Sequence, residues 1–129
     1  MKFGLDIHGV LDNPRHGPAF AEMSKSLIKD GHEVHIITGE HWTDETERNL
    51  QAWGVEFTHH FSIADHHKKI GTPMSYKDPK NPFMDAYLWD RTKADYCKEK
   101  GINMHFDDSP SYGQYFKDKT VYIKVDRNG

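Results

Sequence analysis

The sequence predicts an α/β fold with a mostly parallel central sheet. Two observations support this. Short apolar stretches typical of strands alternate along the chain with segments of helical periodicity, as expected of βαβ units. Several of the predicted strands also end in an acidic or hydroxyl residue, which is where open parallel sheets carry their ligand-binding groups.

Five short stretches predict strands. KFGLDI (2–7) is a short buried strand ending in charge, and EVHIIT (33–38) is rich in β-branched residues. The predicted strands are 2–7, 33–38, 55–61, 103–106 and 120–125.

Apolar spacing and capping residues predict the helices. GPAFAEMSKSLIKD (17–30) has apolar residues at near-helical spacing and precedes Gly31. Thr43 or Asp44 would cap a second helix with an acidic first turn, and Gly54 would end it. The predicted helices are 17–30, 43–54, 63–70 and 83–100, the last with a break near Trp89–Thr92, followed by a helical turn at 111–117.

Length and composition indicate one domain spanning 1–129. The 17 basic and 20 acidic residues give a formal charge of −3, which does not favour a general nucleic-acid binder. The single cysteine, Cys97, excludes an internal disulfide and favours a reducing compartment. Without a signal peptide or an apolar stretch of membrane-spanning length, we expect a cytoplasmic protein with no membrane association.

Two features are less regular. Residues 62–82 hold three of the six prolines, and after a short helix we expect a polar, locally basic loop there, either contacting the substrate or forming a minimal cap. The ten histidines include pairs at 59–60 and 66–67 but lack zinc-site spacing, so we expect them to be mostly solvated on loops or strand edges.

Polar residues stand at the ends of three predicted strands. Asp6 lies at the end of the first strand, Thr38 ends the second, and Asp107 with Asp108 follows the fourth. The carboxyl ends of parallel strands meet at one edge of a sheet, so these groups are expected to lie close together.

The order of these residues resembles that of the haloacid dehalogenase-like (HAD) hydrolase superfamily. LDIHGVLD (5–12) is similar to its first motif except at the third motif position, where His8 replaces a second aspartate. VHIITGE (34–40) is similar to its second motif, and MHFDDSP (104–110) to its acidic fourth motif. The resemblance extends over residues 2–125.

The resemblance implies a Rossmann-like three-layer sandwich and a phosphatase mechanism with Asp6 as the nucleophile. A dianionic phosphate would need a cation beside that carboxylate, and Mg²⁺ suits an all-oxygen site. Gly9 would let the chain turn so that backbone N–H groups face the phosphate. The implied metal ligands are Asp6, the backbone carbonyl of His8, Asp107 and Asp108, and the implied phosphate-binding groups are Thr38, Gly39 and Lys93.

The family's third motif, a lysine, has two candidate positions. Lys93 lies 14 residues before Asp107, with Thr92 or Asp90 as a cap of its helix. Lys68 and Lys69 beside the second histidine pair are the alternative.

His8 occupies the acid/base position of the family's phosphatases. Histidine suits both roles, with an ordinary pKa of about 6.5. A protonated His8 beside Mg²⁺ would be disfavoured by like charge, so we expect a neutral ring and slow turnover. Three outcomes are open: a working substitute, a slow phosphatase or transferase, and a site without turnover.

The interval 13–37 is too short for a cap domain, so we expect an open site. Such a site would accept large substrates, such as phosphorylated macromolecules or nucleic-acid ends, unless a partner subunit closes it. The alternative function is a catalytically inactive phosphate- or metal-binding module that acts through a partner. A response-regulator receiver is disfavoured because there the acidic pair precedes the nucleophile.

Overall fold

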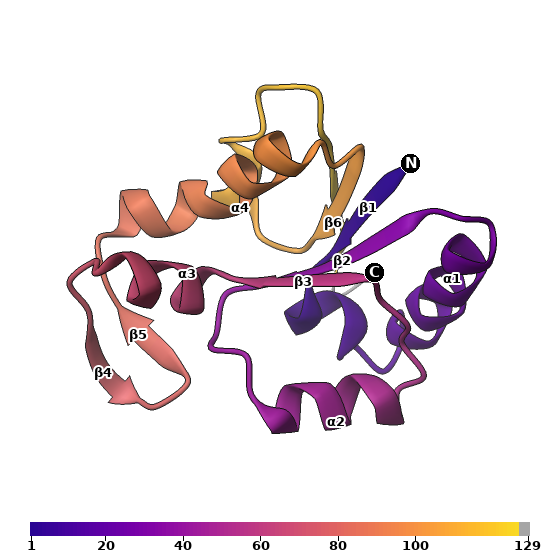
Figure 1. Cartoon of the computed structure of the whole chain (residues 1–129), viewed down its shortest axis with the longest axis horizontal. Coiled ribbons are helices and arrows are strands. Elements are labelled where there is room, and N and C mark those ends of the chain that lie inside the picture. The colour runs from indigo at the N-terminus through magenta and orange to yellow at the C-terminus, as the bar shows by residue number, and fades with distance from the viewer. Residues whose placement is uncertain (127–129) are drawn as a thin grey trace.

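A five-stranded parallel sheet forms the centre of residues 1–126, the part of the chain that the computed structural model describes. The strands lie in the order β3-β2-β1-β6-β7 (Figure 1). Their bounds are β1 (Lys2–Leu5), β2 (Glu33–Thr38), β3 (His59–Ser62), β6 (Met104–Asp107) and β7 (Val121–Lys124). The predicted α/β fold with a parallel sheet is confirmed.

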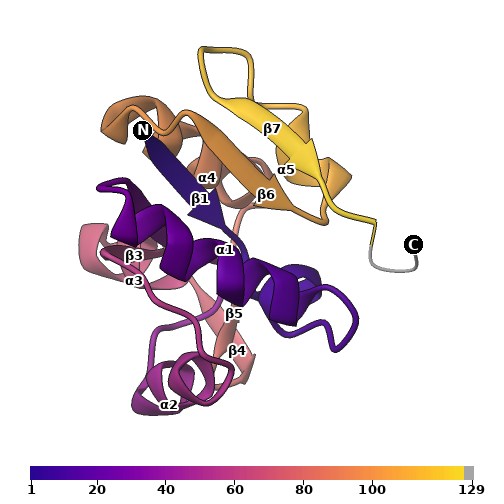
Figure 2. The ribbon, with the colours of Figure 1, turned by 90° about the vertical axis from the view of Figure 1, so that its right-hand side faces the viewer.

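Helices cover both faces of this sheet, which gives three layers (Figure 2). Helices α1 (Gly17–Lys29) and α2 (Asp44–Ala52) pack on one face. Helix α4 (Ala86–Lys100) packs on the other, with α3 (Ile63–Ile70) beside it. The short helix α5 (Pro110–Gly113) follows β6. The architecture is therefore a Rossmann-like three-layer sandwich.

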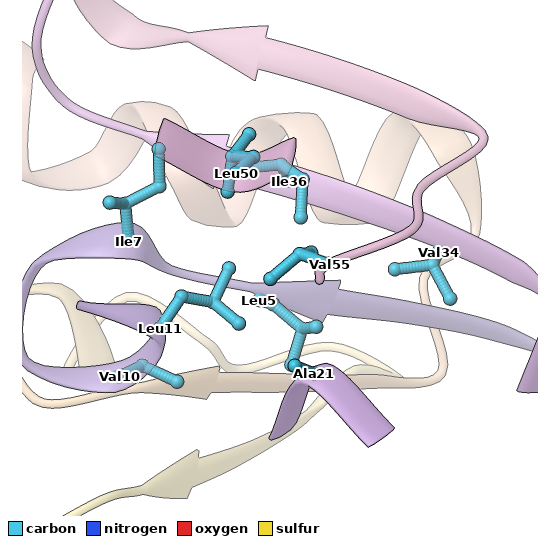
Figure 3. Close-up of a cluster of buried hydrophobic side chains, with 9 residues drawn as sticks. All are labelled: Leu5, Ile7, Val10, Leu11, Ala21, Val34, Ile36, Leu50 and Val55. Atoms are coloured by element: carbon cyan, nitrogen blue, oxygen red, sulfur yellow. The ribbon is translucent and has the colours of Figure 1, made fainter. Parts of the chain in front are cut away.

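Alternation along the strands divides the core between the two faces. Ile36 faces α1 and α2, whereas Ile37 packs with Tyr96 and Cys97 of α4. Burying one such aliphatic side chain contributes roughly 1.5–3 kcal/mol. Figure 3 shows the cluster on the first face, formed by Leu5, Ile7, Val10, Leu11, Ala21, Val34, Ile36, Leu50 and Val55.

Side-chain caps set the starts of three helices. Thr43 caps α2, as predicted, and forms a reciprocal capping box with Thr46. Ser62 caps α3 by accepting from the Asp65 N–H at 3.0 Å, and Asp85 caps α4 by accepting from the Leu88 N–H at 3.0 Å.

Two predicted elements differ from the structure. The strand predicted at 55–61 begins only at His59, because Val55 instead packs into the core beneath α2. Helix α4 begins at Ala86 and runs without the break predicted near Trp89–Thr92; Thr92 bonds the carbonyl one turn back at Leu88.

The segment 62–82 is more ordered than predicted. Helix α3 is confirmed, but the residues after it form an antiparallel hairpin of β4 (Ser75–Asp78) and β5 (Asn81–Phe83). The hairpin is tied to the loop after β2, because the Tyr76 hydroxyl lies 2.9 Å from Nε2 of His41.

The prediction that the histidines are mostly solvated is wrong for three of them. His35, His67 and His105 are at most 5% exposed. Each has polar partners inside the fold: His67, for example, lies 2.8 Å from the Thr92 hydroxyl and so joins α3 to α4. Short polar contacts of this kind remove the cost of burying an imidazole.

Candidate active site

The candidate site lies where the order of the strands in the sheet reverses. From β1 the chain adds β2 and then β3 on one side, and later returns to add β6 on the other. Asp6 follows β1 directly and Asp107 ends β6, and these strands are neighbours with Leu5 opposite Phe106. The crevice at the carboxyl ends of such a pair of strands is the usual ligand site of an open α/β sheet.

A wide turn at Ile7–Leu11 carries the chain away from Asp6. Gly9 has φ +83°, a conformation that a residue with a side chain rarely adopts. Its N–H donates to the Asp12 carboxylate at 2.8 Å, which fixes the turn. The predicted strand 2–7 therefore ends at Leu5, and its last residues belong to this turn.

Lys93 joins the two carboxylates. Its Nζ donates to Asp6 at 2.9 Å and to Asp107 at 2.8 Å, and the lysine is only 1% exposed. Burial alone would lower the pKa of Lys93, but the two carboxylates raise it well above its usual range, so the ammonium stays charged.

The other lysine candidates do not reach this cluster. Lys68 and Lys69 lie on α3 and line hollows away from Asp6 and Asp107. Lys93 itself lies in the middle of α4, so Thr92 and Asp90 are not the caps of its helix; that position belongs to Asp85.

Three carboxylates converge at the same edge. Oxygen atoms of Asp6, Asp107 and Asp108 all lie within 4.8 Å of one another. A set of carboxylate oxygens is what Mg²⁺ prefers, so these residues fit such an ion. When all three acids are ionised, one lysine cannot neutralise them, and a divalent cation would offset the remaining negative charge.

The two central carboxyl groups differ in their surroundings. Burial raises the pKa of Asp6 to about 8; Lys93 opposes this shift and Asp107 adds to it. Asp107 is also buried, but Lys93 and the imidazole of His105, whose Nε2 lies 2.9 Å away, hold its pKa well below the usual range. Asp107 therefore carries the negative charge, whereas Asp6 holds a proton near neutral pH.

We predict that Mg²⁺ binding releases a proton from this cluster, because the ion binds the ionised form of Asp6. Because the pKa of Asp6 is raised by burial, Mg²⁺ affinity should rise with pH through the neutral range, by up to about tenfold per pH unit. Titration calorimetry in two buffers of different ionisation enthalpy measures the number of protons released. Asp6→Asn should bind Mg²⁺ without proton release, and equal heats in both buffers for the wild type would contradict the prediction.

Thr38 offers an unpaired hydroxyl beside this cluster. It ends β2, the strand next to β1, and is fully buried. Its Oγ1 is buried and has no hydrogen-bond partner among the described residues. A buried polar atom of this kind carries a desolvation penalty that a ligand atom would relieve. Thr38 therefore fits a bound oxyanion such as a phosphoryl group.

Two aromatic side chains cover the site. The Tyr112 ring from α5 lies over Lys93, with Nζ 4.6 Å from the ring centre, and Trp89 Nε1 donates to the Tyr112 hydroxyl at 3.1 Å. Trp89 also closes on Gly39, where an added Cβ would lie 2.9 Å from Cζ2 of the indole. Asp6 is only 5% exposed, so its carboxyl group is less accessible in this structure than the open site expected from the sequence.

His8 lies at the edge of the site, between two acids. Its Nδ1 is 3.0 Å from Asp12 and its Nε2 is 3.0 Å from Glu40. Partial burial lowers the pKa of His8, but Asp12 and Glu40 outweigh this effect and raise it above its usual value. The expectation of a neutral ring overlooked these partners, which stabilise the imidazolium. A hollow of about 150 Å³ beside His8 is lined by Lys80 of the hairpin as well as by Glu40.

Several residues of the site were missed from the sequence, and the signals for them differ in strength. Asp12 follows His8 by four positions, a spacing at which a turn brings side chains together. His105 lies two positions before Asp107, on the same side of one strand. Trp89, Tyr112 and Glu40 had no local signal, because they meet only through the packing of α4, α5 and the loop after β2.

Comparison of the sequence with protein-family models and with curated proteins gives no match. The HAD resemblance therefore depends on the motifs and on the fold class alone. None of the helices within residues 1–126 is long and apolar enough to cross a membrane.

Proposed function

We propose that this chain is a Mg²⁺-dependent phosphomonoester hydrolase of the HAD type. One observation carries the proposal: Asp6, Lys93 and Asp107 come from three separate segments and meet at hydrogen-bond distance at the carboxyl ends of β1 and β6. Nothing in the packing of an α/β sandwich requires a buried lysine between two buried acids. Such a group costs free energy to bury, and this cost is accounted for if the group binds a charged ligand.

The residues of the chain divide the chemistry between them. An Asp6 oxygen would attack phosphorus, forming an aspartyl phosphate while the bond to the leaving oxygen breaks. Lys93 and Thr38 would stabilise charge on the phosphoryl oxygens, with the Gly39 N–H as a further donor. Mg²⁺ held by Asp6, Asp107, Asp108 and the His8 carbonyl would neutralise charge between the carboxylate and the phosphate.

His8 would serve as the general acid and then as the general base. With Asp12 on Nδ1, the Nε2 atom is the working atom, and it would move from Glu40 to the leaving oxygen. It would give that oxygen a proton and later take one from the water that attacks the aspartyl phosphate, releasing inorganic phosphate and free Asp6. Asp12 would orient the ring, as a carboxylate does for a catalytic histidine.

The substrate would be a phosphate monoester whose remaining groups lie outside the aromatic cover. The hollow next to His8 gives such groups a place, and its lining holds both signs of charge, with Lys80 paired to Glu45 at 2.9 Å. A phosphorylated macromolecule or nucleic-acid end would enter only if Trp89 and Tyr112 move. We further propose that the protein works in the cytoplasm, consistent with its single, buried Cys97.

The alternative is a phosphate- or metal-binding module without turnover. Two observations favour it: Asp6 is covered, and both ring nitrogens of His8 already have carboxylate partners. In this role the site would bind Mg²⁺ and phosphate and act through a partner.

Phosphate release from a broad panel of phosphomonoesters, with and without Mg²⁺, separates the two functions. We expect Mg²⁺-dependent release by the wild type. Two further variants, His8→Asp and His8→Asp with Glu40→Gln, test whether the site is intact except for the acid/base residue at position 8. The single change places a third carboxylate beside Asp12 and Glu40, so the double variant is the fair test. If none of the three proteins releases phosphate while Mg²⁺ binding is intact, the binding module without turnover is favoured.

We predict that His8→Gln separates the phosphorylation of Asp6 from the hydrolysis of the aspartyl phosphate. An aryl phosphate has a good leaving group, so Asp6 would still be phosphorylated, but no base would activate the water. A burst of phenol release followed by a steady rate lower by about 10²–10⁴-fold is expected. Rapid-mixing absorbance measures the burst, and His16→Gln, outside the site, is the matched control. An unchanged steady rate in His8→Gln would mean that His8 is not the base.

A further inference from the structure

A second cluster of metal-binding side chains lies at the opposite end of the sheet. Glu33 begins β2, His35 follows two residues later, and His59 begins β3. His35 and His59 are register partners on neighbouring parallel strands, so their side chains share one face of the sheet. The candidate active site is at the carboxyl ends of the strands, whereas this cluster is at their amino ends.

The ligand atoms of this cluster have the spacing of a zinc site. Glu33 Oε1 lies 2.8 Å from His35 Nε2 and 3.7 Å from His59 Nδ1, and all three atoms lie within 4.8 Å of one another. A tetrahedral Zn²⁺ with ligands at about 2.0–2.1 Å holds those ligands about 3.3–3.4 Å apart. The two distances to Glu33 lie on either side of that value, and a rotation of the His59 ring out of its stack on His35 would turn its nitrogen toward a shared ion.

The inner histidine is already held in place by a second partner. His35 is 2% exposed, and its Nδ1 lies 2.7 Å from the Tyr96 hydroxyl. Metal-binding histidines commonly use the second ring nitrogen in such a bond, which fixes the tautomer and the direction of the first.

The outer histidine provides access. The His59 side chain is 52% exposed, and its ring stacks on that of His35 with 4.3 Å between centres. Its Nδ1 also lies 2.8 Å from the Thr58 hydroxyl, so the exposed ring would exchange this contact for an ion held by Glu33 and His35.

We propose that Glu33, His35 and His59 form a Zn²⁺ site that joins β2 to the edge strand β3. Two imidazoles and one carboxylate favour zinc over Mg²⁺, which prefers oxygen ligands. The site is independent of the proposed phosphatase activity. Its ion would stabilise the sheet edge at the end opposite the candidate active site.

Titration calorimetry of tag-free protein with Zn²⁺, in excess Mg²⁺ to occupy the acidic cluster, tests the proposal. We expect one Zn²⁺ per chain. His59→Ala should weaken binding by more than about 100-fold, which exceeds the 10–100-fold cost of losing an outer-shell partner. Tyr96→Phe should fall within that 10–100-fold range. Glu33→Gln should weaken Zn²⁺ binding as much as His59→Ala does, because it removes the carboxylate ligand.

The matched control is His60→Ala. His60 is the next residue along β3, but it lies on the other face and stacks on Trp42 with 4.0 Å between ring centres. The His60→Ala variant should bind Zn²⁺ like the wild type, as should Asp6→Asn. The proposal is overturned if the wild type binds no Zn²⁺, if His59→Ala binds it equally well, or if Asp6→Asn abolishes binding.

Discussion

Asp6→Asn is expected to abolish phosphate release, with a fall in rate on the order of 10⁴-fold or more, as seen when an enzyme loses its nucleophile. The amide has nearly the same shape as the carboxylate but cannot form the acyl phosphate. Release of phosphate from the best substrate of the panel measures the rate. Trapping the wild type with borohydride during turnover should reduce the aspartyl phosphate, and peptide mass spectrometry should locate the modified residue at position 6.

Loss of activity in this variant should not come from unfolding. Asp6 is a buried carboxyl with a pKa raised to about 8 by burial, so its replacement by a neutral amide removes no ionised group that the fold depends on near pH 7. Lys93 keeps its bond to Asp107. We expect an unchanged or higher free energy of unfolding without Mg²⁺. Asp44→Asn, at the exposed start of α2, is the control for activity. Wild-type turnover by Asp6→Asn would exclude Asp6 as the nucleophile.

Lys93→Met is expected to destabilise the protein by about 3–5 kcal/mol, the cost of removing one partner from a buried ion pair. Methionine fills a similar volume but leaves Asp6 and Asp107 side by side without a cation. Urea unfolding measures the free energy. Lys98, five residues further along α4, has a side chain that is 68% exposed, and Lys98→Met should change this free energy by less than about 0.5 kcal/mol.

The same variant also tests the metal site. Mg²⁺ should restore much of the stability of Lys93→Met, because a divalent ion between the carboxylates replaces the missing charge. Lys93→Met with wild-type stability, or with no response to Mg²⁺, would show that the three side chains do not form the coupled charge cluster described above.

The parts of the fold that follow local rules could be predicted from the sequence. The positions of β2 and α1 depend on β-branched and helical spacing, and the Thr43 cap depends on a side chain three residues from its partner. The strand predicted from residue 55 was placed too early because an apolar run also suits a core loop, as Val55 shows. The β4–β5 hairpin was missed because its sequence lacks alternation.

The residues of the candidate site also divide into those that local sequence predicts and those that only tertiary packing brings together. Asp6, Thr38 and Asp107 could be proposed from strand ends, because parallel topology alone brings such ends to one edge. Lys93 could be placed only as one of two candidates, since its burial depends on how α4 crosses the sheet. The aromatic cover and the acids beside His8 depend on tertiary packing, and the pKa of His8 follows from those partners.

The burial of Asp6 affects how long a phosphoryl group would remain on it. A phosphoryl group on this aspartate would lie beneath Trp89 and Tyr112, shielded from bulk water and from other nucleophiles. Its lifetime would then depend on how often a single indole–phenol hydrogen bond breaks and on one histidine at the rim. In such a protein the duration of the phosphorylated state would be set by side chains of helices α4 and α5, and substitutions at Trp89 or Tyr112 would change it without altering the residues that perform the chemistry.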